Sequence, residues 1–287
     1  MRLLTFRADG ATHVGVLRPD GDEIAVITGV SDMLTLIDAD ADGLKAAKAA
    51  LDGGRSRHRL AEVTVLAPVP MPRGNVIAIG RNYQAHADES ARAAGRAAEP
   101  PTVFTKAVTS ITGPYDDINV DGAVTGQVDW EVELGVVVGR TGAGISRAQA
   151  LDHVFGYVAI NDVSARDVQF GWGGQYFKGK SLDGFCPFGP WIVTRDQIPD
   201  PQALRLQLRL NGQTKQDAST RDMIYPVDAI LEWVSKGMTL LSGTVIATGT
   251  PDGVGFARTP PEFVNSGDVM EAEVEGIGIL RNKVLIK

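Results

Sequence analysis

The fold is decided by the stretch Asp129-Trp130-Glu131-Val132-Glu133-Leu134-Gly135-Val136-Val137-Val138 of this 287-residue chain. Its apolar, β-branched end predicts a strand, in which neighbouring side chains point to opposite faces. Glu131 and Glu133 are then expected on one face, ~7 Å apart. Two carboxylates beside such an apolar run are costly to bury unless a cation neutralises them. A cation site and a solvated polar face are therefore both open interpretations of the pair.

A third carboxylate follows a second apolar strand. The run from 154 to 160 ends abruptly in Asn161-Asp162, and functional groups are commonly presented where regular elements end. Three carboxylates without a cysteine or a paired histidine make a hard oxygen site, which suits Mg²⁺ or Mn²⁺ and does not suit zinc. Calcium fits such ligands but is less apt for catalysis.

A histidine and a glutamate stand together after another strand. The segment Gly80-Arg81-Asn82-Tyr83 precedes an Ala-rich helical pattern, in which His86 and Glu89 are three positions apart on one face. A carboxylate so placed can orient an imidazole and raise its basicity. The alternative is a solvent-exposed helix with an incidental histidine. The small residues up to Glu99 suggest a closing lid.

The first part of the chain reads as a small α+β unit. Strands are expected at 2–7, 12–17 and 23–26, before a helix from Ser31 to Leu51. Prolines at 68, 70 and 72 predict an extended linker. We therefore divide the chain into a small N-terminal domain, residues 1–70, and a larger domain, residues 71–287.

The larger domain is expected to be rich in strands. Helical patterns are few: 146–154, the segment after Tyr83 through Ala98, and 226–236. Without regular alternation of strand and helix, neither a doubly wound sheet nor a TIM barrel fits, and the prediction is a β-rich α+β fold. The expected strands are 75–79, 128–138, 154–160, 191–193, 204–210, 244–247, 269–274 and 277–284.

The charge and apolar composition of the chain argue against some classes of binding partner. The 28 Lys and Arg residues against 35 Asp and Glu give a net charge of −7, and such a surface repels nucleic acid. No apolar run reaches the roughly 18 residues that span a bilayer, and the first residues do not resemble a secretory signal. We therefore expect no nucleic acid, no membrane and a cytoplasmic location. The single cysteine, Cys186, is expected to be a small buried apolar residue.

The chain resembles the fumarylacetoacetate hydrolase family, in particular its short bacterial members with a fumarylacetoacetase C-terminal-like domain. The resemblance implies a mixed β-roll or sandwich for this domain and covers about residues 74–284. It rests on ordered blocks: Gly80-Arg81-Asn82-Tyr83 with His86 and Glu89, residues 129–134, Gly156-Tyr157, Asn161-Asp162-Val163-Ser164-Ala165-Arg166-Asp167, Lys180-Ser181-Leu182-Asp183, Gly189-Pro190, and Thr248-Gly249-Thr250-Pro251.

The resemblance also implies roles for single residues. Glu131, Glu133 and Asp162 would hold Mg²⁺ or Mn²⁺. Lys180 would lie beside metal and substrate as a catalytic residue, together with a dyad that activates water. The members of that dyad are His86 and Glu89.

Four further positions are implied to bind substrate: Arg81, Tyr83, Gln169 and Thr250. Gln169 would reach a substrate oxygen, and Thr250 would lie near the substrate carboxylate. The chain departs from many relatives at Gly184, where they place a threonine, and this puts one hydrogen bond near the site in doubt. The loop from Phe170 to Phe177 differs among members and is expected to shape the pocket.

Together the residues and the resemblance predict a metal-dependent hydrolase. It would cleave a C–C bond in a 2,4-dioxo acid, of the acylpyruvate or 2,4-diketo-3-deoxy sugar acid type, to give pyruvate or a related 2-oxo acid and a carboxylic acid. An oxaloacetate-type decarboxylase or a 2-hydroxydienoate isomerase would use the same metal site. An alternative of another class is a noncatalytic metal-binding scaffold.

The expected assembly is a homodimer. The resemblance implies it, and the apolar strands near the C-terminus are more numerous than one small sheet needs. The sequence does not determine the exact substrate or the physiological metal, and it leaves hydrolysis, decarboxylation and isomerisation open.

Overall fold

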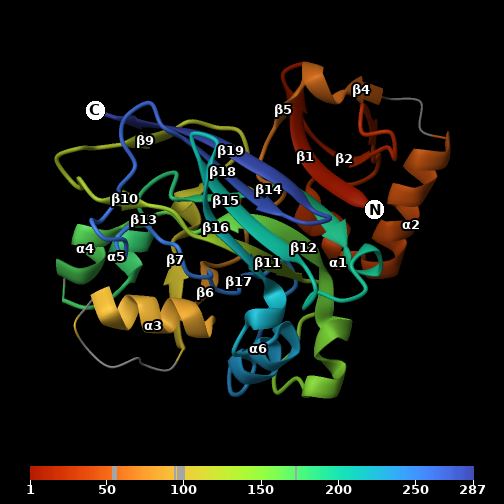
Figure 1. Ribbon diagram of the computed structural model, residues 1–287. Coiled ribbons are helices and arrows are strands. Elements are labelled where there is room, and N and C mark those ends of the chain that lie inside the picture. Colours follow the sequence, from red (N-terminus) through yellow and green to blue (C-terminus); the bar gives the residue numbers. More distant parts are fainter. Residues whose placement is uncertain (54–56, 94, 96–100, 172) are drawn as a thin grey trace.

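Two layers of strands form the body of the molecule (Figure 1). The computed structural model describes residues 1–53, 57–93, 95, 101–171 and 173–287. The larger sheet has one continuous row of strands and two short strands beside it: β5 (Thr64–Val65) pairs with β1, and β8 (Ile111–Thr112) pairs with β14. The continuous row runs β4 (Arg57–Arg59), β3 (Glu23–Val26), β2 (Ala11–Leu17), β1 (Arg2–Ala8), β14 (Cys186–Thr194), β12 (Val154–Asn161), β11 (Val132–Val138), β17 (Val245–Ala247), β6 (Val76–Gly80) and β7 (Thr102–Lys106).

A smaller sheet packs on one face of the larger one. Leu134 of β11, Leu208 and Leu280 are fully buried in the core between the two. A short pair, β10 (Val128–Asp129) and β13 (Ser164–Ala165), lies at the side of this sandwich. The arrangement confirms the predicted β-rich α+β class. The smaller sheet has the order β16 (Gln213–Ser219), β15 (Arg205–Leu210), β18 (Val269–Val274), β19 (Gly278–Ile286) and β9 (Ile118–Val120).

Two helices cover the other face of the large sheet. The single helix expected from Ser31 to Leu51 is wrong, because the chain turns between α1 (Met33–Asp38) and α2 (Asp40–Gly53). Asp40 has a φ of 44°, which ends the first helix and redirects the chain. The helices approach closely at Gly43, where a Cβ atom would lie 2.2 Å from the Leu36 carbonyl oxygen.

The N-terminal strands continue the large sheet. Arg2 and Leu3 of β1 pair with Val193 and Ile192 of β14. A separate apolar cluster, which includes Phe6, fills the space between the N-terminal strands. The division at residue 70 into two domains stays a prediction.

The remaining helices are short. The pattern at 146–154 forms a 3₁₀ helix, Arg147–His153, and the one at 226–236 forms α6 (Val227–Val234). The helix expected through Ala98 is α3 (Gln84–Ala93), and residues 94 and 96–100 lie outside the described residues. The remaining α-helices of the described residues are α4 (Arg166–Gly171) and α5 (Phe177–Lys180). Further 3₁₀ turns lie at Leu60–Glu62, Val108–Ser110, Arg195–Gln197 and Thr220–Asp222.

Strands β7 and β16 were not expected from the sequence. Both are rich in polar residues, and β16 lies at the edge of the smaller sheet with several exposed side chains. An apolar pattern therefore does not mark them.

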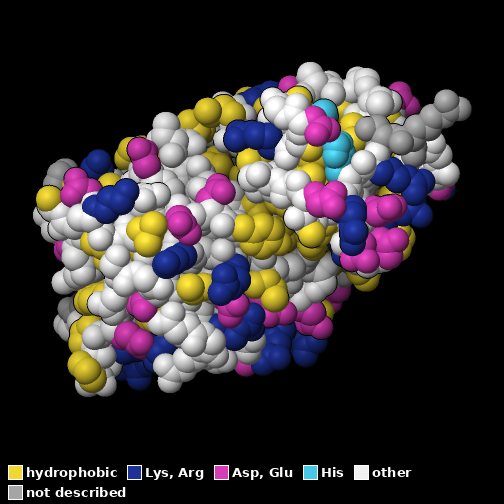
Figure 2. Space-filling view, turned by 90° about the horizontal axis from the view of Figure 1, so that it is seen from above, with side chains coloured by type: hydrophobic (Ala, Val, Ile, Leu, Met, Phe, Trp, Pro, Cys, Tyr) yellow, Lys and Arg dark blue, Asp and Glu magenta, His cyan; other side chains and the backbone are white. Residues whose placement is uncertain are grey.

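The surface is of mixed charge. Figure 2 shows Lys and Arg side chains intermixed with Asp and Glu over the face that it draws. Among the described residues, no helix has the length and apolar character needed to cross a membrane. The cytoplasmic location stays a prediction.

Close packing of strands gives the first prediction. A Cβ atom at Gly156 in β12 would lie 2.4 Å from the Val193 carbonyl oxygen of β14. Gly156→Ala should therefore lower the free energy of unfolding by about 1–3 kcal/mol, as overpacking does. Urea unfolding would measure the change. The matched control is Gly74→Ala, where a Cβ meets no atom within 4 Å; equal midpoints for the two variants would contradict the prediction.

Candidate active site

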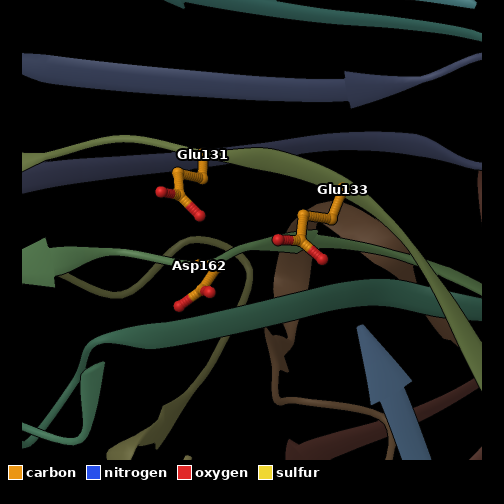
Figure 3. A group of neighbouring side chains, drawn as sticks. All are labelled: Glu131, Glu133 and Asp162. Atoms are coloured by element: carbon orange, nitrogen blue, oxygen red, sulfur yellow. The ribbon is translucent and has the colours of Figure 1, made fainter. Parts of the chain in front are cut away.

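The site lies where β11 begins and its antiparallel neighbour β12 ends. Val132 pairs with Asn161 in the ladder, and the Asp162 N–H then donates to the Glu131 carbonyl oxygen at 2.9 Å. This contact brings Asp162 beside Glu131, and Figure 3 shows the carboxylates of Glu131, Glu133 and Asp162 turned toward one another. One carboxylate oxygen from each lies within 4.8 Å of the others.

The predicted alternation of faces is confirmed. Trp130, Val132 and Leu134 are buried in the core between the sheets, on the face of β11 opposite Glu133. The strand is interrupted at Trp130 and Glu131, so Glu131 precedes β11 rather than lying within it. Glu131 and Glu133 are only 5% and 1% exposed, so the alternative of a solvated polar face is wrong.

Two buried cations hold two of these carboxylates. Lys180 Nζ donates to Glu131 Oε2 and to Asp162 Oδ2, both at 2.8 Å. The Arg166 guanidinium donates to Glu131 Oε1 at 2.7 Å. For Glu133 the structure gives a hydrogen bond from the Gly249 backbone N–H, at 2.6 Å.

These partners separate the acidities of the two glutamates. Burial favours the neutral form of Glu131, but the charges of Lys180 and Arg166 outweigh it and lower its pKa to about 2. Burial, together with the charges of Asp162 and Glu131, raises the pKa of Glu133 well above its usual range. When Glu133 is ionised, its negative charge is therefore less well neutralised by neighbouring groups than that of Glu131.

The donor set fits a divalent cation. In the described part of the chain, this cluster has four buried carboxyl groups and three buried basic side chains, so the acidic groups outnumber the basic ones by one and a bound cation would allow Glu133 to ionise. Carboxylate oxygens are the ligands preferred by Mg²⁺ and Mn²⁺. The acidic members are Asp129, Glu131, Glu133 and Asp162, and the basic members are Lys106, Arg166 and Lys180.

Lys106 was missed by the sequence reasoning as a site residue. It is fully buried at the end of β7, and its Nζ donates to Asp162 Oδ1 at 2.5 Å. It also donates to the backbone carbonyls of Val163 and Lys180. A lysine that ends a strand has no distinctive spacing, so only the pairing of β7 with β6 reveals its role.

The two helices α4 and α5 place polar side chains in one cavity: Arg166 and Gln169 from α4 and Lys180 from α5. Phe170, Gly174, Gln175 and Tyr176 line it as well, in the stretch that was expected to shape the pocket. Arg166 Nη1 donates to Gln169 Oε1 at 2.9 Å, which leaves the Gln169 amide N–H groups for a ligand. The two helices touch at Gly179, where a Cβ atom would lie 2.6 Å from Gln169 N. Arg166 lies in a block that the sequence reasoning quoted, but its role was not assigned there.

Both members of the predicted dyad lie on α3, where His86 is buried and Glu89 is partly buried. His86 is 5% exposed, so the alternative of an exposed helix histidine is wrong. Its Nδ1 is 3.5 Å from Glu89 Oε2 and makes no hydrogen bond within the described structure. The Glu89 carboxylate instead accepts from the Gly253 N–H, at 3.0 and 3.1 Å for its two oxygens.

One cavity of about 730 Å³ is lined by His86, Glu131, Glu133, Arg166, Gln169 and Lys180. Arg81, which has a φ of 60° and donates to the Tyr176 hydroxyl, also lines it. Thr250 lines it too, but its hydroxyl donates to Val132 O and accepts from Gln216 Nε2. Tyr83 is 1% exposed in the main core and is not among the lining residues. The substrate-binding roles of these residues stay predictions.

Two further expectations concern the segment after α5. Gly184 has a φ of 79°, a conformation that a threonine would adopt only with strain. Cys186 is fully buried, as expected, and burial raises the pKa of its thiol to about 12.

The unequal compensation of the two glutamates gives a prediction. Glu133→Gln should stabilise the metal-free protein at neutral pH by about 0.5–2 kcal/mol, because it removes a carboxyl group whose raised pKa in the folded state costs folding free energy above the ordinary carboxyl pKa. Glu131→Gln should destabilise it, since Arg166 and Lys180 lose a charged partner. Both should weaken Mn²⁺ binding. Urea unfolding after chelation and calorimetric Mn²⁺ titration would measure these effects; stability changes of the same sign would contradict the assignment.

The chain is similar to known proteins over most of its length. A family model described as fumarylacetoacetate hydrolase C-terminal matches residues 75–285. The oxaloacetate tautomerase YisK of Bacillus subtilis is 45% identical over 231 residues, which cover 80% of this chain and 76% of that protein. The mitochondrial oxaloacetate tautomerase fahd2 of Xenopus laevis is 36% identical over 293 residues, 99% of this chain and 90% of that protein.

Solved structures share the whole fold. A fumarylacetoacetate hydrolase from Exiguobacterium antarcticum has a TM-score of 0.87 and 41% identity, with all of both chains covered. A maleylpyruvate hydrolase from Sphingobium sp. SYK-6 has a TM-score of 0.82 and 33% identity, again over all of both chains. A 2-hydroxyhepta-2,4-diene-1,7-dioate isomerase from Mycobacterium marinum has a TM-score of 0.77 and 34% identity, covering 100% of this chain and 99% of the other. This chain therefore belongs to the fumarylacetoacetate hydrolase family of enzymes.

Proposed function

We propose that this enzyme moves a proton on a small 2-oxo acid, and that its reaction is the enol–keto tautomerisation of oxaloacetate. Relatives at 45% and 36% identity carry that name. The observation that carries the proposal is the position of His86, a buried imidazole that opens into the same cavity as Glu131, Glu133 and Lys180.

In this reaction a proton leaves the enol oxygen on C2 and another is added at C3. His86 is the imidazole that lines the cavity, and an imidazole is the side chain that most often carries a proton in general acid–base catalysis. Its Nε2 is 3.5 Å from Ser90 Oγ, and its Nδ1 faces Glu89. Either nitrogen can therefore exchange a proton with a substrate atom or with a neighbouring side chain.

The other side chains hold the substrate oxygens. Lys180 carries a positive charge at Glu131 and Asp162, where negative charge on the C2 oxygen would be stabilised. Gln169, fixed through its carbonyl by Arg166, can donate its amide N–H to a carboxylate oxygen. A Mg²⁺ or Mn²⁺ ion held by the three carboxylates would supply Lewis-acid polarisation of the 2-oxo group.

The assembly of the dyad favours tautomerisation over hydrolysis. A hydrolase would use His86 to deprotonate water, a role that a carboxylate hydrogen-bonded to Nδ1 would support. The hydrogen bonds of the Glu89 carboxylate come from Gly253 N–H, and the 3.5 Å separation from Nδ1 is too long for a good one. Proton transfer to carbon needs no such orientation of a water molecule.

Hydrolysis of a 2,4-dioxo acid is the second candidate. The similarity to a maleylpyruvate hydrolase favours it, and a small movement of Glu89 would complete the dyad. Acylpyruvates and 2,4-diketo-3-deoxy sugar acids are its substrate classes. Decarboxylation of oxaloacetate and isomerisation of a 2-hydroxydienoate would place the same charge on the C2 oxygen and remain further outcomes of the assay below.

The reaction is tested with His86→Ala. The variant should lower the Mn²⁺-dependent tautomerisation of enol-oxaloacetate, above the buffer-catalysed rate, by about 10²–10⁴, the usual contribution of a positioned acid–base group. Ultraviolet absorbance of the enol measures the rate, with CO₂ and pyruvate release followed in parallel. An acylpyruvate is assayed in the same way.

Controls separate the possible roles of His86. Mn²⁺ affinity should be unchanged, because His86 is assigned no ligand role, and His58→Ala in the N-terminal strands should retain full activity. Undiminished tautomerisation in His86→Ala would refute the proposed role. The wild type could also release pyruvate from the acylpyruvate faster than it converts oxaloacetate. That result would favour the hydrolase over the tautomerase.

A homodimer is proposed as the assembly. The apolar C-terminal strands pack inside the sandwich, so support now comes from the family and from large apolar side chains on the surface, such as Trp233 and Phe170, which are 58% and 49% exposed. Sedimentation velocity at micromolar protein should give a species of twice the 30.5 kDa chain mass. A single species of the chain mass would contradict this.

A further inference from the structure

Asp129 is a buried carboxylate with no assigned role. It is fully buried at the end of β10. Oδ1 accepts from the backbone N–H groups of Trp130 and Gly255, at 2.8 and 2.7 Å. Oδ2 accepts from Arg166 Nε at 2.8 Å and from the Phe256 N–H at 3.0 Å. All four donors converge on one side chain that does not line the cavity.

One side of this carboxylate fixes Arg166. Through its other nitrogens Arg166 donates to Glu131 Oε1 at 2.7 Å and to Gln169 Oε1 at 2.9 Å. The orientation of a proposed metal ligand and of a proposed substrate donor therefore depends on a guanidinium that Asp129 holds.

The carboxylate also fixes the loop of residues 253–256, which hydrogen-bonds to Glu89 of the dyad. Gly253, two residues before Gly255, donates its N–H to the Glu89 carboxylate. Phe256 lies on Arg166, with the guanidinium 4.4 Å from the ring centre. The loop has little freedom at Gly255, because a Cβ atom there would lie 2.0 Å from the Glu262 carbonyl oxygen and 2.6 Å from Asp129 Oδ1.

We propose that Asp129 is a positioning residue that sets both halves of the site from one buried carboxylate. Through Arg166 it orients Glu131 for the cation, and through residues 253–256 it sets the place of Glu89 beside His86. The role of Asp129 through residues 253–256 rests on the proposed function. Its role through Arg166 rests on cation binding alone.

Replacing the carboxylate by an amide has a defined consequence. In Asp129→Asn, the amide oxygen can still accept from Trp130 and Gly255, but the NH₂ group would face the donors of Arg166 and Phe256. Arg166 then keeps Glu131 as its remaining carboxylate partner, so it competes more strongly with a cation for that ligand. Mn²⁺ affinity should fall by about 10- to 100-fold, the usual loss when an outer partner of a metal ligand is removed.

The experiment is a double-mutant cycle read by Mn²⁺ affinity. The free-ion signal in electron paramagnetic resonance gives the affinity of wild type, Asp129→Asn, Arg166→Gln and the double variant. If Asp129 acts through Arg166, its substitution should change Mn²⁺ affinity by no more than about twofold once Arg166 is Gln. An equal loss in both backgrounds, or no loss in the wild-type background, would overturn the proposal.

Two features keep this test decisive. If Asp129→Asn alone fails to fold, because it leaves Arg166 buried with less counter-charge, the double variant removes both charges and is compared with Arg166→Gln. The matched control is Asp116→Asn, another carboxylate that accepts from a backbone N–H and a hydroxyl, those of Gly113 and Thr112. It should retain wild-type Mn²⁺ affinity.

Enzyme turnover separately tests the proposed effect of Asp129 on the loop of residues 253–256. At saturating Mn²⁺, kcat for oxaloacetate should be about tenfold lower in the double variant than in Arg166→Gln, because the released loop no longer holds the Glu89 charge opposite His86 Nδ1, where it supports the protonated imidazole. KM should differ little between the two. Equal kcat values for the double variant and Arg166→Gln would overturn the proposed effect on this loop. Absence of turnover in the wild type would refute the proposed function and leave the Mn²⁺ cycle as the test of the first half.

Discussion

The hydrogen bond from the Asp162 N–H to the Glu131 carbonyl fixes the geometry on which the site depends. It extends the contact between β11 and β12 one step beyond their last pair, Val132 with Asn161. A shift of this register by one residue would turn the side chains of a strand to the opposite face. Glu133 would then enter the apolar core, and Asp162 would lose its place beside Glu131.

This geometry gathers like charges, and buried cations compensate for them unequally. Lys180 and Arg166 neutralise Glu131, and Lys106 with Lys180 neutralises Asp162, so these groups stabilise one another. Glu133 has the Gly249 N–H and the unfavourable charges of its neighbours. A site that keeps such a group loses some stability in exchange for cation affinity, as functional sites commonly do.

Close backbone approach then sets the walls of the cavity. Gly179 lets α5 lie against α4, which aligns Lys180 with Gln169. Gly255 lets the 253–256 loop reach Asp129 on one side and Glu262 on the other. These contacts join α3, the loop and the adjoining ends of β11 and β12, so that His86, Glu131 and Glu133 line the same cavity.

The sequence by itself determined the class of fold, the alternation of faces along 129–138 and the identity of the three carboxylates, because periodicity and residue type are local properties. It also located His86 and Glu89 on one helix. Only the tertiary structure decided that Lys106 and Arg166 neutralise the site, that Asp129 joins two of its parts, and that Glu89 hydrogen-bonds Gly253 rather than His86. These partners lie far apart in the chain, and their meeting depends on strand register and loop packing, which no local pattern encodes.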